Sequence, residues 1–135
     1  MPLTLRDSLP FTTITVTFQG TTMDIPQVLV DTGSATTLLA ADIVATIGIV
    51  PLPQDVLHTL RGVGGTEVVF TRRLDSLQVG ERHLTDFEIE VGGMDYGFAM
   101  HGILGMDFLI RARAIINLRE MTIAFAIDEE RTEAG

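Results

Sequence analysis

The stretch Val28-Leu29-Val30-Asp31-Thr32-Gly33-Ser34 places a carboxylate directly after three consecutive apolar residues. A strand becomes fully apolar where it enters a core, so we expect Asp31 at the end of a buried strand. Gly33 lets the backbone turn tightly and offers an amide to the carboxylate, and Ser34 can donate a hydrogen bond to an oxygen of Asp31. A charge is unfavourable there, which makes Asp31 the first candidate for chemistry.

Two other interpretations of Asp31–Ser34 stay open on these residues alone. Asp, Gly and Ser are all favoured in ordinary turns, so the tetrapeptide can be turn chemistry and nothing more. The pattern also matches the Asp-x-Gly-x-Thr/Ser phosphate loop of actin-like ATPases. Those enzymes need two lobes, whereas a chain of 135 residues has room for one domain, and this chain has no lysine for phosphates.

Short strands separated by turn residues account for most of the chain. Alternation of apolar and polar residues predicts strands at 11–18, 23–30, 36–39, 56–60, 68–70, 74–79, 84–91, 114–118 and 121–127. Helical spacing predicts two short helices, at residues 40–47, ended by Gly48, and at 106–111. The pattern predicts a mainly β, closed or sandwich-like single domain over residues 1–135, with a frayed acidic tail at 128–135.

The composition excludes several kinds of chemistry. Nine arginines, no lysine and no cysteine stand against eighteen acidic residues, for a net charge of −9. Schiff-base and thiol catalysis, disulfides and cysteine-ligated zinc are therefore excluded, and we expect no nucleic-acid partner. His58, His83 and His101 lack metal-ligand spacing, so we expect no metal and no other cofactor. No signal peptide or membrane-spanning run is evident, which predicts a cytoplasmic protein without a membrane partner.

Two glycine-containing segments follow the Asp31 stretch in the chain. Gly62-Val63-Gly64-Gly65 lies between two apolar runs and predicts the tip of a hairpin, and Gly102-Ile103-Leu104-Gly105 directly precedes the second short helix. The three segments in this order, within residues 11–127, resemble the retropepsins, the single-lobe aspartic proteases of retroviruses and their bacterial relatives. The additional helix near residues 42–47 favours the bacterial or cellular branch.

The resemblance implies a single-lobe acid-protease β-barrel with one or two short helices that works as a two-fold homodimer. It implies that Asp31 is catalytic, that Gly62–Gly65 is a flap over an extended peptide or protein substrate, with Val63 near its tip, and that Ile103-Leu104-Gly105 backs the active site. It further implies that the Thr32 hydroxyl joins a hydrogen-bonded lock across the two-fold axis. A local bond within its own turn is the alternative for Thr32.

The chemistry of peptide hydrolysis by carboxyl groups agrees with the need for two copies. One carboxylate must deprotonate a water molecule while a carboxylic acid protonates the carbonyl oxygen. This chain has one Asp-Thr-Gly, so a two-fold axis through the cleft would set Asp31 against Asp31 of a second copy. The expected activity is that of an aspartic endopeptidase; the alternative is a non-proteolytic peptide- or protein-binding dimerisation module on the same fold.

Several other features are expected to be structural. Asp107 falls in the first turn of the second helix, where the helix dipole favours a carboxylate. Glu88 and Glu90 alternate on one strand face and are expected to meet solvent. The strands near both termini are expected to leave sheet edges, which the family joins across the two-fold axis.

Overall fold

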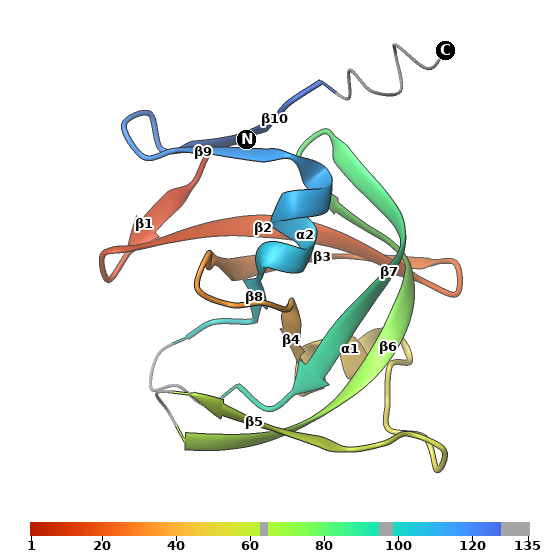
Figure 1. Cartoon of the computed structure of the whole chain (residues 1–135). Helices are drawn as coiled ribbons and strands as arrows, with labels where there is room; N and C mark the ends of the chain where they lie inside the picture. The colour runs from red at the N-terminus through yellow and green to blue at the C-terminus, as the bar shows by residue number, and fades with distance from the viewer. Residues whose placement is uncertain (63–64, 95–98, 128–135) are drawn as a thin grey trace.

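The threonine-rich alternation after residue 10 forms the first long hairpin, which consists of β2 (Leu9–Phe18) and β3 (Thr21–Val30). The computed structural model describes residues 1–62, 65–94 and 99–127, and of residues 60–62 and 65–67 it describes the backbone alone. The other elements are β1 (Thr4–Arg6), β4 (Leu38–Ala40), α1 (Ala41–Val44), the 3₁₀ helix η1 (Ala45–Ile47), β5 (His58–Gly62), β6 (Gly65–Val79), β7 (Arg82–Gly92), β8 (Gly102–Leu104), α2 (Met106–Ala112), β9 (Ala114–Asn117) and β10 (Thr122–Phe125) (Figure 1).

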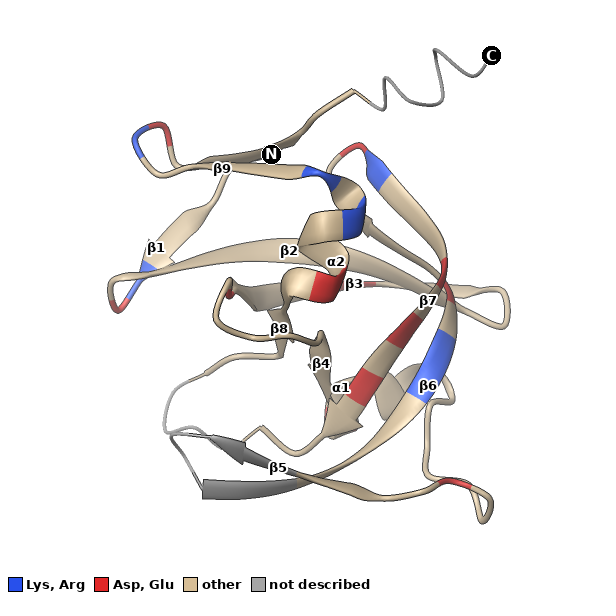
Figure 2. Cartoon of the chain, in the orientation of Figure 1, with Lys and Arg blue, Asp and Glu red and all other residues tan. Residues whose placement is uncertain are grey.

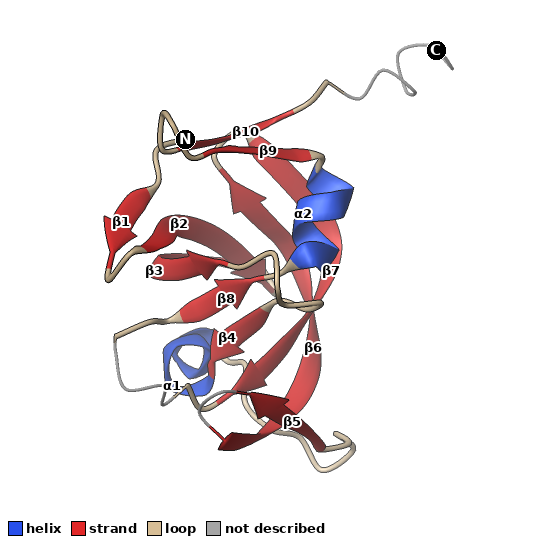
Figure 3. Ribbon diagram, turned by 60° about the vertical axis from the view of Figure 1, so that its left-hand side comes forward, coloured by secondary structure: helices blue, strands red, loops and turns tan. Residues whose placement is uncertain are grey.

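One eight-stranded sheet makes up most of the molecule, with the strand order β1-β2-β3-β8-β4-β7-β6-β5. The pairs β3–β8 and β4–β7 are parallel, and the other neighbours are antiparallel. A further antiparallel pairing between β2 and β6 closes the sheet on itself (Figure 3). The predicted mainly β, closed fold with two short helical segments is therefore confirmed.

The main core fills the inside of this closed sheet and extends under helix α2. Phe108 of α2 is fully buried between Phe87 and Phe125, with ring centroids 5.8 and 6.4 Å away in edge-to-face contacts. Buried aliphatic side chains from the strands complete the core, among them Ile14, Val16, Ile25, Leu39, Leu74, Leu77, Ile89 and Leu104. The aromatic contacts fix α2 against β7 and β10.

Both helical segments lie where the sequence predicts them. The first consists of α1 and η1 and ends at Gly48, whose φ of 94° is the left-handed conformation that glycine adopts without strain. The second, α2, starts directly after Gly105 and carries Asp107 in its first turn. The helical expectations for residues 40–47 and 106–111 are thus confirmed to within one or two residues.

One strand is longer than the sequence predicts. Residues 68–70 and 74–79 are not separate strands, because β6 runs without a break from Gly65 to Val79. Thr71, Arg72 and Arg73 interrupt the apolar pattern yet stay in register with β7. Arg72 is accommodated there because its guanidinium forms an ion pair with Asp55. Strand β6 pairs with β5 along one part of its length and with β7 along the other, so it belongs to two hairpins.

The N-terminal segment pairs with the C-terminal hairpin β9–β10 inside the same chain. The Leu3 amide donates to the Met121 carbonyl at 2.8 Å, and the Ile123 amide donates to the Met1 carbonyl at 2.9 Å. Both edges of β10 are therefore occupied, so the prediction of an open edge is wrong for this strand. Within the described residues, the outer edge of β9 has no partner strand. The tail expected to fray, 128–135, lies outside the described residues.

Candidate active site

Asp31 is half-buried at the first position after β3. Its amide donates to the Leu104 carbonyl at 3.0 Å, which extends the pairing of β3 with β8 by one bond. The Gly33 amide donates to Oδ1 of Asp31 at 2.8 Å, as the sequence predicts. The turn therefore fixes the orientation of the Asp31 carboxyl group.

The two residues after Thr32 have different roles from each other. A Cβ atom at Gly33 would lie 3.2 Å from Oδ1 of Asp31, so glycine leaves room for the carboxylate as well as an amide. The prediction for Ser34 is wrong, because its Oγ donates to the Thr36 carbonyl at 2.7 Å and not to Asp31. A hydroxyl has one proton to donate. Ser34 therefore supports the shape of the loop and not the charge of Asp31.

The Thr32 side chain is exposed at the turn. Within the described part of the chain, no group forms a hydrogen bond with its hydroxyl, so the alternative of a local bond in its own turn is not realised. The hydroxyl is available to a second subunit. Its contact across a two-fold axis stays a prediction.

The predicted backing strand, Ile103-Leu104-Gly105, lies directly beside the Asp31 loop. Its strand β8 is parallel to β3 on one side and antiparallel to β4 on the other. At Gly105 a Cβ atom would lie 2.3 Å from the Thr36 carbonyl oxygen, so the two backbone segments approach as closely as only glycine permits. The Met106 amide then donates to the Ser34 carbonyl at 2.8 Å. The start of α2 and the end of the loop are therefore one rigid unit.

Asp107 holds the far end of the same loop through Thr37, a residue that sequence analysis did not single out. Its Oδ1 accepts from the Thr37 hydroxyl at 2.7 Å, and its Oδ2 accepts from the Thr37 amide at 3.1 Å. Thr37 is fully buried, and its Oγ1 accepts from the Gly105 amide at 3.1 Å. The helix position of Asp107 was predictable, but no sequence signal links two residues that lie 70 positions apart.

The glycine-rich segment after residue 61 forms the end of a hairpin, as predicted. Strands β5 and β6 pair from His58 opposite Val69 to Gly62 opposite Gly65. Val63 and Gly64, which complete the predicted flap, lie outside the described residues. The use of this hairpin as a flap stays a prediction.

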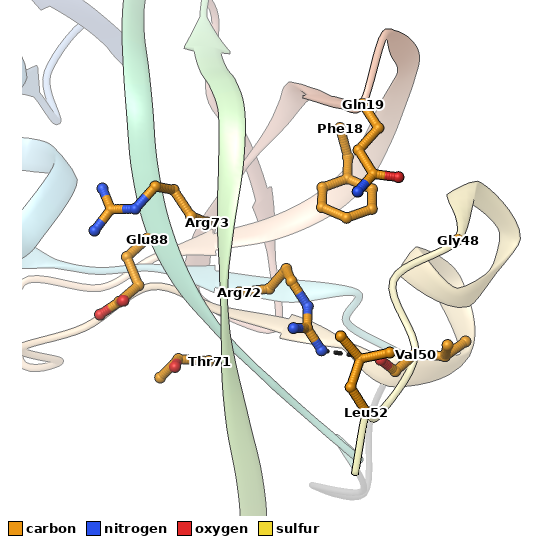
Figure 4. Close-up of a pocket in the computed structure, with 9 residues that line it drawn as sticks. All are labelled: Phe18, Gln19, Gly48, Val50, Leu52, Thr71, Arg72, Arg73 and Glu88. Atoms are coloured by element: carbon orange, nitrogen blue, oxygen red, sulfur yellow. Dashed lines mark hydrogen bonds between the residues drawn. The ribbon is translucent and has the colours of Figure 1, made fainter. Parts of the chain in front are cut away.

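An ion pair between Arg72 and Asp55 anchors the chain that leads into this hairpin, and Figure 4 shows the hydrogen bond that Arg72 also makes to Val50. Arg72 donates to both oxygens of Asp55, at 2.7 and 3.2 Å, and to the Val50 carbonyl at 2.9 Å. The Leu52 amide also donates to Asp55, at 2.6 Å. Hydrogen bonds from Arg72, and then from Leu52, lower the pKa of the Asp55 carboxyl below its ordinary value. The loop before β5 is thereby fixed to the middle of β6.

Among the described residues, one hollow along the sheet adjoins the Asp31 loop and a larger one lies apart from it. The larger, about 540 Å³, is the pocket drawn in Figure 4; it lies beside Arg72 and has no lining residue from that loop. The smaller, about 460 Å³, lies between the loop, the hairpin arm β5 and strand β7. It is lined by Thr36, His58, Thr59, Thr71, Glu88, Ile89, Glu90 and Asp107. Glu88 is exposed, as predicted, whereas Glu90 is half-buried.

A small apolar cluster, separate from the main core, lies on the same face of the sheet as Asp31. Leu29 of β3 lies two positions before Asp31, whose amide continues the pairing with β8, so strand alternation sets the two side chains on the same side. Leu29 pairs with Phe11 of β2 and with Ile103 of β8. The cluster consists of Phe11, Leu29 and Met100, with Leu9, Met94 and Ile103 packed against them.

The histidines are spread over three parts of the fold. His58 begins β5, His83 lies in β7, and Nδ1 of His101 is 2.9 Å from the Pro26 carbonyl oxygen. Among the described residues, no group of three or more His, Asp or Glu side chains could hold a metal ion. No helix in the same part of the chain is long and apolar enough to cross a membrane.

Known proteins share both the sequence pattern and the fold. The family described as "gag-polyprotein putative aspartyl protease" matches residues 14–111. A retropepsin-like aspartic protease from Rickettsia conorii is 20% identical with a TM-score of 0.66, covering 92% of this chain and 97% of that one. EIAV protease, solved with the inhibitor HBY-793, is 22% identical with a TM-score of 0.59, covering 83% and 95%.

No curated protein matches the sequence. At identities of 20% and 22%, the similarity to the two solved structures supports the fold alone. The family match is the stronger finding, because it spans the Asp31 loop, the β5–β6 hairpin and β8. The chain therefore belongs to the gag-polyprotein aspartyl protease family and has the retropepsin fold.

Proposed function

We propose that the protein is an aspartic endopeptidase that works as a homodimer, with Asp31 from each of two subunits in one active site. One observation carries the proposal. In a chain of the aspartyl protease family, Asp31 directly follows a buried strand, and its carboxylate accepts a hydrogen bond from the Gly33 amide at 2.8 Å. A carboxylate that takes part in a reaction must keep one orientation, and this turn supplies it.

Two carboxyl groups with one proton between them supply both halves of the acid–base chemistry. The ionised carboxylate removes a proton from water as the water attacks the peptide carbonyl carbon, and the protonated carboxyl donates its proton to the carbonyl oxygen. The C–N bond of the tetrahedral intermediate then breaks as the leaving nitrogen takes a proton from the carboxyl pair, and one hydroxyl of the intermediate returns a proton to the pair as the product carbonyl forms. Repulsion between like charges favours the singly protonated pair, so we expect the highest rate at acidic pH.

A homodimer is required because each chain carries one Asp-Thr-Gly. A two-fold axis beside the loop would bring the two Asp31 carboxylates together and give them equivalent surroundings. The exposed hydroxyl of Thr32, without a partner in the described residues, supports a contact between the two loops at that axis.

An extended peptide is the substrate that the surroundings of Asp31 favour. Leu29 and Ile103 lie in paired strands on the same side as Asp31, so we expect apolar side chains next to the scissile bond. The β5–β6 hairpin would close over the peptide as a flap, with Gly62–Gly65 at its end, and bind it as an added strand. The chemistry uses two carboxyls and a water molecule, so no cofactor enters the proposal.

The test is cleavage of an unbiased peptide pool at acidic pH by the wild type and by Asp31→Asn. The substitution removes the ionisable group while keeping nearly the same shape, so we expect a folded dimer and a rate at least about 10²-fold lower. Asp42→Asn is the matched control, because Asp42 lies in the first turn of α1 without a side-chain cap bond. A rate within about tenfold of wild type for Asp31→Asn would place the chemistry elsewhere.

The same experiment separates the enzyme from a non-proteolytic binding module on this fold. A module would retain peptides from the pool without releasing fragments, in the wild type and in Asp31→Asn alike. Cleavage products that appear with the wild type alone support the endopeptidase.

A further inference from the structure

Arg6, the last residue of β1, carries a guanidinium group that is only partly satisfied. Its Nη1 atom is buried and has no hydrogen-bond partner. Its Nη2 atom donates to the Ala99 carbonyl at 3.4 Å, at the long end of hydrogen-bond distances. The group lies 5.0 Å from the centroid of the Phe11 ring. A permanent positive charge therefore rests against an aromatic face with one of its donor atoms unused.

Two other arginines of the chain contrast with Arg6. Arg72 donates to both oxygens of Asp55, and Arg73 forms an exposed ion pair with Asp86 at 3.4 Å. A buried donor on a charged group is unfavourable until an acceptor reaches it, and a carboxylate is the acceptor that matches a guanidinium best. Among the described residues, no Asp or Glu fills that place beside Arg6.

The strand register places Arg6 in the same row as Asp31. Arg6 lies opposite Leu9 in the β1–β2 pair. In the antiparallel β2–β3 pair, Phe11 lies opposite Leu29. If the same register is extended by two residues past the end of β3, Leu9 lies opposite Asp31. Adjacent strands lie about 4.8 Å apart, so the backbones of Arg6 and Asp31 are separated by roughly 10 Å. Leu9 lies between them in this row, and Phe11 and Leu29 of the apolar cluster lie in the neighbouring row with Thr4.

We propose that Arg6 binds a carboxylate of the substrate, so that the enzyme selects peptides with Asp or Glu close to the scissile bond. This inference rests on the proposed function. An extended peptide advances about 3.3 Å per residue, so a separation of roughly 10 Å corresponds to about three residues. The Nη2 bond to the Ala99 carbonyl is exposed and long, so Nη2 is the donor that such a carboxylate would reach, while Nη1 stays buried. A dimer contains two copies of Arg6, so the preference is expected on both sides of the bond.

The experiment measures peptide binding separately from cleavage. The Asp31→Asn protein, which cannot turn over substrate if the proposed function is right, is incubated at about pH 6 with an unbiased peptide pool, and retained peptides are identified by mass spectrometry. We expect enrichment of Asp and Glu within about three positions of a central apolar pair. Matched synthetic peptides with Glu or Gln at the enriched position should differ in Kd by about tenfold, the size expected of a charge-assisted hydrogen bond.

Three further variants test whether the preference for acidic peptides depends on Arg6. In Asp31→Asn/Arg6→Gln the Glu and Gln peptides should bind equally, whereas Asp31→Asn/Arg6→Lys should keep part of the preference because the charge remains. Arg73→Gln in the same background is the matched control, since it removes an exposed cation that already has a partner. The preference should also disappear below about pH 4, where the peptide carboxyl becomes protonated.

Failure of this inference and failure of the proposed function give different results. Retention of peptides without acidic enrichment, or equal preference with and without Arg6, overturns the role of Arg6 even if the wild type cleaves peptides. Loss of the dimer in Arg6→Gln, measured by sedimentation, also overturns it, because the carboxylate would then belong to the partner subunit. Acidic enrichment without any cleavage by the wild type supports Arg6 and contradicts the endopeptidase.

Discussion

Asp107 joins helix α2 to the candidate active-site loop by two hydrogen bonds to one buried residue, Thr37. Removing the carboxylate in Asp107→Ala would leave the Thr37 amide and hydroxyl without their acceptor. We expect the free energy of unfolding to fall by about 1.5–3 kcal/mol, the range for hydrogen bonds to charged groups. We also expect kcat/KM to fall, because the loop that carries Asp31 loses its support. Urea unfolding and peptide cleavage measure the two effects.

Asp42→Ala is the control for that experiment. Asp42 occupies the equivalent first-turn position in α1 and makes no cap bond, so its loss should change stability by less than about 0.5 kcal/mol. Equal stability and activity of Asp107→Ala and Asp42→Ala would mean that the loop keeps its shape without the bonds to Thr37.

The variant Ser34→Ala tests whether the Ser34 hydroxyl donates its hydrogen bond to the Thr36 carbonyl or to Asp31. Because Ser34 donates to the Thr36 carbonyl, Ser34→Ala should lower stability by about 1 kcal/mol and leave the pH profile of kcat/KM in place. A profile that moves to higher pH would contradict this, since it would mean that the hydroxyl stabilises the ionised Asp31 in the working dimer. The profile of wild type and variant on one peptide decides between the two.

At this scale, the sequence predicts contacts between neighbours far better than contacts at long range. The Gly33 amide on Asp31 was predictable, because a two-residue turn leaves the amide few other directions. The hydroxyl of Ser34 has several acceptors within reach, and sequence does not rank them. The pairing of Thr37 with Asp107 depends on how β4 and α2 are placed by the rest of the fold.

Among the elements, β6 differs most from the sequence prediction, because one continuous strand replaces the two predicted at 68–70 and 74–79. Residues 71–73 look like a break between two strands, because Arg72 stands where a half-buried position would favour an apolar side chain. Asp55 and the Val50 carbonyl satisfy its guanidinium, so the strand continues. Where alternation was uninterrupted, as in β2 and β7, the prediction was correct to within a few residues.

The same ion pair makes the anchoring of the hairpin sensitive to pH. The pKa of Asp55 is lowered below its ordinary value of 3.8, so the ion pair stabilises the folded chain above that pH. As the pH falls through the lowered pKa, Asp55 is protonated and this stabilisation is lost. We expect hydrogen exchange of the β5 and β6 amides, corrected for intrinsic rates, to be constant from about pH 6 to 4.5 and to accelerate below about pH 3.5.

In Asp55→Asn the acceleration should be present already at pH 6, and the step at low pH should be absent. Asp86→Asn is the matched control, because it breaks an exposed pair with the neighbouring Arg73. An unchanged exchange pattern in Asp55→Asn would show that the chain before β5 is held by packing alone.

At the scale of the whole molecule, the negative net charge opposes formation of the homodimer that the proposed function needs. Each chain carries a net charge of −9, and Figure 2 shows acidic residues on several elements, including β7 and α2. Two such chains repel each other at neutral pH, and both salt and acid weaken that repulsion. An acidic optimum would therefore reflect association of the subunits as well as the carboxyl pair. Activity should accordingly be compared at concentrations where sedimentation finds the same fraction of dimer.

The terminal strands offer a way to disturb that assembly without disturbing the subunit. Truncation after Leu118 is unsuitable, because it removes Ile123 and Phe125 from the main core. Ile115 is 53% exposed on β9, and the outer edge of β9 has no partner among the described residues. If the protein forms the proposed homodimer, the family resemblance implies that the terminal strands take part in the subunit contact. Ile115→Glu adds a charge to that edge, so we expect a folded monomer without activity.

Ile110→Glu makes the same chemical change at a position on α2 that is 65% exposed, and it should remain a dimer with wild-type activity. Sedimentation and specific activity over a dilution series measure both properties. For the wild type we expect specific activity to fall on dilution together with the fraction of dimer, because one Asp31 cannot both deprotonate water and protonate the carbonyl oxygen. Activity that stays constant while the dimer dissociates would contradict the shared active site, wherever the interface lies.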